Sequence, residues 1–325
     1  RRNRFALLMV VTVISGGILF ADNPIVPNVG MADPHIHIFD DKAYLYATHD
    51  YSPKNTGFTT YDWWVWSSSD LIHWQYACTL NPDDTYVGPM SACWATDAAM
   101  RNGYTYWYLS VGNTVAVVRG DSPRGPWYDV LGKPLVTGGY DPATFVEDTG
   151  EVYLVYGIWG FKIAKLNDDM ISLAQEPRDI TITDPEGPFG PGLTDDKPDL
   201  HKHKDTYYLS WGSYYATSKN LYGPYACQGS FIDPDLIAGP FREKIESLWG
   251  NLNYDRHGKF FEWNGQWYYV CNDQSQSHAT AAFRDTIITY VFYRDNGEIA
   301  PIVIDKYGVS RIDSRKKNVN RRTTQ

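Results

Sequence analysis

Two aspartates that are each followed directly by proline are the best candidates for chemistry in this chain. Asp33 precedes a run in which histidines alternate with isoleucines, and Asp141 precedes the run Ala143–Phe145. A proline disfavours the α region for the residue before it, so we expect extended backbone to present each carboxylate at the start of a strand. Asp-Pro also opens many turns. Two copies in similar surroundings, in a chain with the repeat described next, favour a role in chemistry.

A recurring hairpin phrase shows which elements position these aspartates. Short runs rich in aromatic and β-branched residues follow polar or glycine-containing turns, which indicates an all-β chain. The markers of five such phrases lie 62, 47, 54 and 60 residues apart, at Tyr44, Tyr106, Tyr153, Tyr207 and Trp267. Repeats of this length are typical of propeller blades. We therefore predict a five-bladed β-propeller of four-stranded blades, in which Asp33 and Asp141 converge at one end of the central channel.

Composition limits the class of partner. The 325 residues carry a formal net charge of −9, which argues against nucleic acid, because phosphate contacts need clustered Lys and Arg. The chain also contains 12 Trp and 25 Tyr, whose flat apolar faces can stack on sugar rings or fill cores between strands. A neutral poly- or oligosaccharide is the expected partner, and the oligomeric state stays open.

The two ends of the sequence differ from the rest. A basic stretch, residues 1–4, precedes an apolar run over 5–20, as in a secretory signal peptide cleaved near Ala21. A single membrane anchor is the alternative. We predict a signal peptide at 1–22, a propeller domain at 23–313 with no membrane span in the mature chain, and a disordered basic tail at 314–325. The expected location is the periplasm or the medium.

Four cysteines, Cys78, Cys93, Cys227 and Cys271, show no metal-binding spacing. In an oxidising compartment they allow three pairings, of which Cys78 with Cys93 closes the shortest loop. Free buried thiols are the alternative, since a chain of this length needs no disulfide for stability.

Several phrases together resemble those of glycoside hydrolase family 43, from about Asn23 to Val309. They are Ala32-Asp33-Pro34, Trp94-Ala95-Thr96-Asp97, Asp141-Pro142-Ala143-Thr144-Phe145, Lys197-Pro198-Asp199-Leu200-His201-Lys202 and Arg256-His257-Gly258. That family consists of five-bladed propellers and includes α-L-arabinofuranosidases and β-xylosidases. The resemblance implies an inverting hydrolase that needs no cofactor. Its three carboxylates are a general base, a general acid, and an aspartate that tunes the acid.

Asp33 matches the base of the family and Asp141 the tuning residue. The acid is less direct, because the family has Glu ahead of Gly-Pro or Lys-Pro, whereas Asp196 stands there in this chain. Asp196 is our first choice. Glu186, which precedes Gly-Pro in a turn-rich stretch, and Asp199 are the alternatives.

Other positions carry over as substrate or metal sites. The resemblance places Asp97 in the substrate pocket, and we assign substrate contacts to aromatic residues that follow strand positions facing the channel: Trp94, Phe145, Trp159, Trp211 and Tyr214. Each of these aromatic residues can equally belong to the core between blades. His257 matches a family histidine near the axis that helps to hold a calcium ion or a water cluster, although a histidine hydrogen-bonded in the core would look the same.

The expected function is an exported inverting glycosidase for arabinose-, xylose- or galactose-containing plant polysaccharides, with exo or endo cleavage left open. One rival is a catalytically weak or silent carbohydrate-binding propeller, because the acid is shortened. Another is a retaining enzyme of the related fructan-cleaving family. It is disfavoured because the Asn-Asp-Pro phrase of that family reads Ala32-Asp33-Pro34 here.

Overall fold

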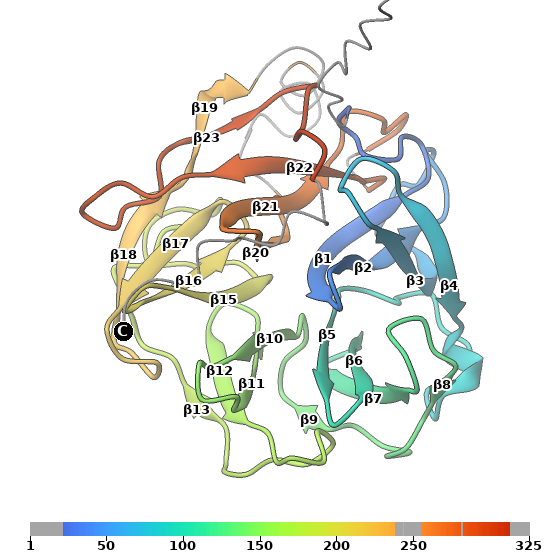
Figure 1. Ribbon diagram of the computed structural model, residues 1–325. Coiled ribbons are helices and arrows are strands. Elements are labelled where there is room, and N and C mark those ends of the chain that lie inside the picture. Colours follow the sequence, from blue (N-terminus) through green and yellow to red (C-terminus); the bar gives the residue numbers. More distant parts are fainter. Residues whose placement is uncertain (1–21, 238–242, 244–254, 281, 313–325) are drawn as a thin grey trace, which may run out of the picture.

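The computed structural model describes residues 22–237, 243, 255–280 and 282–312, and nearly all regular structure in them is β (Figure 1). Antiparallel sheets follow one another around a central axis. The first two sheets are β1 (Met31–Phe39), β2 (Lys42–Asp50), β3 (Thr60–Ser68) and β4 (Gln75–Leu80), then β5 (Thr96–Arg101), β6 (Tyr104–Val111), β7 (Thr114–Gly120) and β8 (Trp127–Tyr128), with β9 (Val136–Thr137) paired to β7. A 3-10 turn, η1 (Pro82–Asp84), connects them.

The third and fourth sheets follow next around the axis. They are β10 (Ala143–Val146), β11 (Val152–Gly157), β12 (Phe161–Lys165) and β13 (Arg178–Asp179), then β15 (Pro198–His203), β16 (Thr206–Trp211), β17 (Tyr214–Ser218) and β18 (Tyr225–Ser230), with β14 (Ile182–Thr183) parallel to β18. The last sheet is β20 (Gly258–Trp263), β21 (Gln266–Asp273) and β22 (Asp285–Val291), and β19 (Ile232–Ile237) pairs in parallel with β23 (Ile302–Ile304) beside it.

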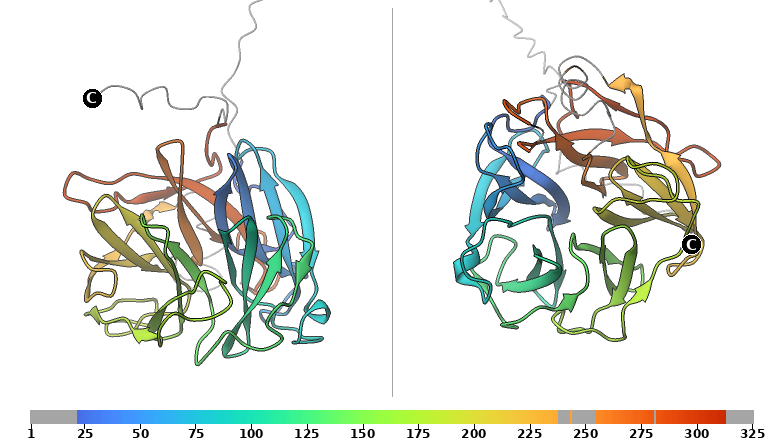
Figure 2. Two further views of the ribbon diagram at one scale, coloured as in Figure 1. Left: turned by 60° about the horizontal axis from the view of Figure 1, so that its bottom comes forward. Right: turned by 180° about the vertical axis from the view of Figure 1, so that it is seen from behind.

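The innermost strands close a ring of five. β1 contacts β5 and β20, β10 contacts β5 and β15, and β15 contacts β20, so these five strands surround the axis (Figures 1 and 2). The predicted five-bladed propeller is confirmed. All five aromatic markers of the hairpin phrase fall on the second strand of a blade, namely β2, β6, β11, β16 and β21. The prediction of four strands in every blade is not met, since the fifth sheet has three strands within the described residues.

Both faces of a blade are buried, which explains where most of the aromatic residues go. On β6, Tyr106 and Tyr108 pack toward the third blade, whereas Trp107 and Leu109 pack toward the first. Successive residues of a strand point to opposite faces, so a continuous apolar strand serves two cores. Much of the aromatic content therefore holds the blades together.

Residues near the start of the chain tie the first blade to the fifth. The Asn23 side chain donates to the Ile288 carbonyl at 3.1 Å and accepts from the Ile288 amide at 3.0 Å, while its backbone amide donates to the Lys306 carbonyl at 2.9 Å. The Asp285 carboxylate accepts the amides of Asn28, Val29 and Gly30. These bonds close the ring between β1 and β22.

All four cysteines are free thiols, so the predicted Cys78–Cys93 bridge is wrong. Cys93 is buried, and the sulfur of Cys78 accepts a hydrogen bond from the Trp127 indole at 3.4 Å. The predicted signal peptide and basic tail lie outside the described residues, except for Asp22. Over the ranges that the structure describes, no helix is long and apolar enough to cross a membrane.

Candidate active site

A pocket of about 260 Å³ lies where the inner strands begin, and we call it the axial pocket. It combines five carboxylates, two cations, a histidine and an aromatic wall. The lining residues are Asp33, Phe58, Trp94, Tyr140, Asp141, Trp159, Phe189, Asp195, Asp196, Lys197, Asp255, His257 and Arg284.

Four of these residues share an unusual backbone conformation at the starts of blades. Asp33, Asp141, Lys197 and Asp255 have φ values of 48°, 54°, 68° and 50°, in the left-handed region. The expectation of extended backbone at Asp33 and Asp141 is therefore wrong. Hydrogen bonds hold the strained residues, because the Asp33 amide donates to Asn272 Oδ1 at 2.7 Å and the Asp141 amide donates to Ser110 Oγ at 2.9 Å. Strain of this kind tends to gather at functional sites.

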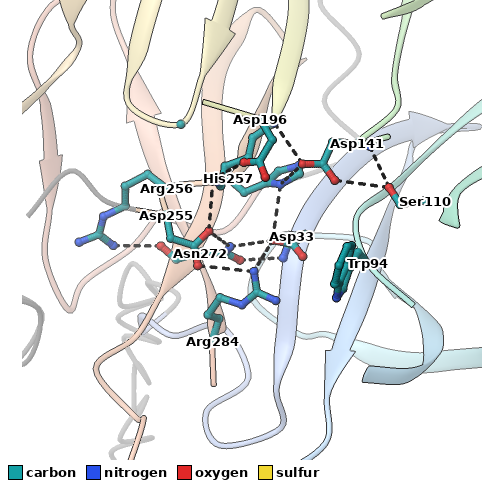
Figure 3. A network of polar contacts seen from close by, with 12 residues as sticks. Asp33, Trp94, Ser110, Asp141, Asp196, Asp255, Arg256, His257, Asn272 and Arg284 are labelled. Atoms are coloured by element: carbon teal, nitrogen blue, oxygen red, sulfur yellow. Dashed lines mark hydrogen bonds and ion pairs between the residues drawn. The ribbon is translucent and has the colours of Figure 1, made fainter. Parts of the chain in front are cut away.

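Asp33 is almost completely buried and is surrounded by donors (Figure 3). Arg284 Nη1 lies 2.7 Å from Asp33 Oδ1, the Asn272 amide donates to the same oxygen at 2.8 Å, and His257 Nδ1 lies 3.5 Å away. Burial alone would raise the pKa of Asp33, but the Arg284 guanidinium, His257 and Asn272 together hold the pKa below its ordinary value. Asp33 is therefore ionised near neutral pH, as a general base must be.

Asp141 behaves in the opposite way. Its carboxylate accepts from the Lys197 amide at 3.1 Å and from the Ser110 hydroxyl at 3.4 Å, and among the described residues no cation lies as close to it as Arg284 does to Asp33. Burial, reinforced by the negative charges of Asp196 and Asp33, raises the pKa of Asp141 well above its ordinary value. One pocket thus holds a carboxyl group whose pKa is lowered and another whose pKa is raised, a contrast that acid–base catalysis uses.

Asp196 lies across this pocket with about a fifth of its side chain exposed. Its carboxylate contacts the Lys197 ammonium and accepts a hydrogen bond from the Tyr140 hydroxyl at 3.4 Å. Burial is the largest single influence and acts to raise the pKa of Asp196, but the charge and hydrogen bond of Lys197, together with His257 and Asp195, bring the pKa below its ordinary value. The neighbouring Asp195 also lines the pocket, and burial raises its pKa to about 6.

The two alternative acids lie elsewhere. Glu186 is exposed and lines a separate depression with Thr183 and Gly229 at the outer edge of the fourth blade. Asp199 is fully buried and bonded to the Lys259 ammonium at 2.8 Å. Of the three candidates for the acid, only Asp196 belongs to the axial pocket.

The aromatic predictions divide according to location. Trp94 and Trp159 line the axial pocket, and Trp159 is half exposed with its ring at 74° to that of Phe189. Trp211 and Phe145 do not, because both are buried in the core between the third and fourth blades. Tyr214 packs against the same core. We therefore correct Phe145, Trp211 and Tyr214 from substrate contacts to packing residues.

Asp97 also needs correction, since it does not line the axial pocket. It is fully buried, accepts from His37 Nε2 at 2.5 Å, and accepts from the amide and hydroxyl of Thr144 at 2.6 and 2.9 Å. Lys259 Nζ lies 3.2 Å from it. Its oxygens are occupied by protein donors, so Asp97 holds inner strands together.

His257 lies on the axis, but its surroundings fit calcium poorly. Its Nδ1 faces Asp33, and its Nε2 lies 3.2 Å from His35 Nε2. Calcium takes six to eight oxygens, whereas the carboxylates recorded beside His257 are Asp33, which already binds Arg284, and Asp141, 4.0 Å away. In the part of the chain that the structure describes, no three His, Cys, Asp or Glu side chains are arranged to hold a metal ion.

Sequence reasoning missed several residues that shape the pocket. Arg284 and Asn272, which set the charge of the base, follow Asp33 by 251 and 239 residues and stand in no motif. Lys197 could have been found, because it precedes a proline at a blade start as Asp33 and Asp141 do.

Comparisons with known proteins agree with this geometry. The family model described as "Glycosyl hydrolases family 43" matches residues 21–299. A "Xylosidase/arabinosidase" of Bacteroides ovatus is 25% identical over 86% of this chain and 96% of its own. A "Beta-D-galactofuranosidase xynD" of Aspergillus niger is 30% identical, covering 89% and 87%. The structure of a family 43 β-xylosidase/α-arabinofuranosidase from a compost metagenome, in a calcium-free complex with xylotriose, superimposes with a TM-score of 0.73 at 27% identity, covering 87% and 97%.

Proposed function

The chain belongs to glycosyl hydrolases family 43 and is a glycoside hydrolase, and on that premise we propose that it inverts configuration while releasing arabinose or xylose from plant polysaccharides or their oligosaccharides. Galactose is the third candidate sugar. The names of the relatives support this range of sugars. The observation that carries the mechanism is the contrast between Asp33, whose carboxylate contacts Arg284 and Asn272 and whose pKa is lowered, and Asp141, whose pKa is raised by burial.

The proposed reaction uses two carboxyl groups on one pocket. Asp33 takes a proton from water while the water oxygen bonds to the anomeric carbon, and protonated Asp196 gives its proton to the leaving glycosidic oxygen. Asp141 accepts a hydrogen bond from the backbone amide of Lys197, the residue after Asp196, and thereby orients the acid and tunes its pKa. The products are the free sugar and the shortened glycan, and proton exchange with solvent restores both carboxyls.

The size of the axial pocket favours a single terminal or side-chain sugar. About 260 Å³ is small among ligand pockets, and the half-exposed rings of Trp159 and Phe189 lie at its wall. We propose that Trp94 contacts the bound sugar and Trp159 the leaving part. No step involves a cofactor, and we propose no structural calcium beside His257, whose surroundings fit that ion poorly.

Sugar release from arabinan, arabinoxylan and galactan by wild type and Asp33→Asn tests the function, with NMR of the first-formed anomer. Release with inversion by wild type, lost in Asp33→Asn, supports it. Retained configuration would remove the inverting mechanism. Glycan binding without release would favour a weak or silent propeller. The lowered pKa of Asp196 is the reason to consider this alternative, because an acid with a low pKa is less often protonated.

We also propose export, on the basic and apolar leader that ends near Ala21. Fractionation of producing cells tests it, and activity found only in the cytoplasm would contradict it.

A further inference from the structure

Lys197 occupies the blade-start position at which the first and third blades carry aspartates. Like Asp33 and Asp141, it precedes a proline, and its φ is 68°. A side chain with a Cβ pays in strain for this conformation, which glycine adopts freely. A buried lysine at such a position needs a compensating set of contacts.

Those contacts reach the carboxylates on the acid side of the pocket. The Lys197 ammonium donates to Asp196 Oδ1, donates to Asp195 Oδ2 at 2.9 Å and lies 4.0 Å from Asp255 Oδ1. Its backbone amide donates to Asp141 Oδ2 at 3.1 Å. Only about 9% of the side chain is exposed, so water screens these interactions weakly.

We propose that Lys197 is a positioning residue of the hydrolysis: its ammonium fixes the Asp196 carboxyl at the pocket wall and confines turnover to acidic pH. The inference rests on the proposed function, in which Asp196 is the acid.

The charges around Asp196 give the direction of the effect. The titratable groups that face it are Tyr140 and Asp141 ahead of β10, Asp195 and Lys197 on its own segment, and Asp255 and His257 ahead of β20. Among them Lys197 provides the strongest opposition to burial, and it lowers the pKa of Asp196. An acid works only while protonated, and its protonated fraction falls about tenfold for each pH unit above its pKa. A lowered pKa therefore moves the basic limb of kcat/KM to lower pH.

The test compares pH profiles of kcat/KM on a natural oligosaccharide, whose leaving group needs the acid. In Lys197→Met we expect the basic limb of the kcat/KM profile to move up by about one pH unit or more. At a pH above the basic limbs of both proteins, the ratio of variant to wild-type kcat/KM should therefore grow about tenfold. Lys197→Arg keeps the cation and should leave the limb in place. Lys202→Met is the matched control, because Lys202 lies on β15 shortly after Lys197 and its ammonium binds Glu147 and Asp148 outside the axial pocket.

Folding and function are separated by further measurements. Lys197→Gly removes the same charge and relieves the left-handed strain, so it serves if the methionine variant does not fold, and circular dichroism checks both. A 2,4-dinitrophenyl glycoside needs no acid, so the shift should disappear with it. An unmoved limb in either folded variant, or an equal shift with the dinitrophenyl substrate, would overturn the role of Lys197. No sugar release from any glycoside by wild type, or full activity of Asp196→Asn on the oligosaccharide, would overturn the proposed function itself.

Discussion

Replacing Arg284 by methionine tests the electrostatic account of the base. The guanidinium contacts Asp33 through Nη1 at 2.7 Å and Asp50 through Nε and Nη2, each at 2.9 Å, and about 5% of its side chain is exposed. Methionine keeps much of the apolar stem and removes the charge. Asp33 then loses the strongest of the interactions that keep it ionised.

The size of the effect follows from Coulomb's law. Two unit charges about 4 Å apart interact by about 4 kcal/mol at an effective dielectric constant of about 20. At about 1.4 kcal/mol for each pKa unit, complete loss would raise the pKa of Asp33 by about three units. Water that enters the space left by the guanidinium solvates the carboxylate and recovers part of this loss, so we expect about two. Because the base must be ionised, the acidic limb of kcat/KM moves up by the same amount, and activity at a pH below both limbs falls about a hundredfold.

The assay measures kcat/KM against pH on a dinitrophenyl glycoside, which needs no acid and so isolates the base. Loss of one partner from a buried ion pair costs about 3–5 kcal/mol, so urea unfolding must show that the variant stays folded. Arg101→Met is the control, since Arg101 pairs with the exposed Asp168. An acidic limb that stays put in folded Arg284→Met, or that moves equally in Arg101→Met, would refute the reasoning.

Three further predictions concern the pocket wall, the core and calcium. Trp159→Ala should raise KM for oligosaccharides about fivefold with little change in kcat, because a ring contact contributes about 1 kcal/mol to binding; steady-state kinetics check this, and an unchanged KM would place the leaving part elsewhere. Gly258→Ala should lower the free energy of unfolding by about 2 kcal/mol or more, since a Cβ there would collide with the Val270 carbonyl and lie 2.7 Å from the Cβ of Cys271; urea denaturation measures it, and wild-type stability would contradict it. Chelation of calcium should leave the wild-type Tm unchanged. Lys259→Ala should lower the Tm by several degrees, because Asp97 and Asp199 would lose the ammonium group that pairs with both carboxylates. A wild-type Tm that falls on chelation would show that the channel does bind calcium.

The fold was predictable because its signals are local and repeated. Alternation and turn residues mark each hairpin, and the five aromatic markers all fall on second strands. Asp33 and Asp141 stood out through short phrases at blade starts, whereas Asp196 followed from the resemblance to the family, and all three line one pocket.

The misassigned aromatic residues show the limit of periodicity. Because both faces of a blade are buried, Trp211 and Phe145 follow the same strand pattern as residues that would line a channel. Only the packing of neighbouring blades separates them from Trp94. Arg284 shows a second limit, since its contact with Asp33 spans 251 residues and no local pattern records it. The rule for residues before proline failed at Asp33 for a similar reason, because its amide is held by distant Asn272.

The bonds that close the ring bring two distant parts of the chain within reach of one another. Asn23 is hydrogen-bonded to Lys306, so a short linker between these segments could join them, and new termini could be opened in the exposed turn at Gly132 and Lys133. Such a circular permutant would keep every inner strand and its pocket residues. A propeller rearranged in this way changes the order in which the blades are made while leaving the catalytic arrangement intact.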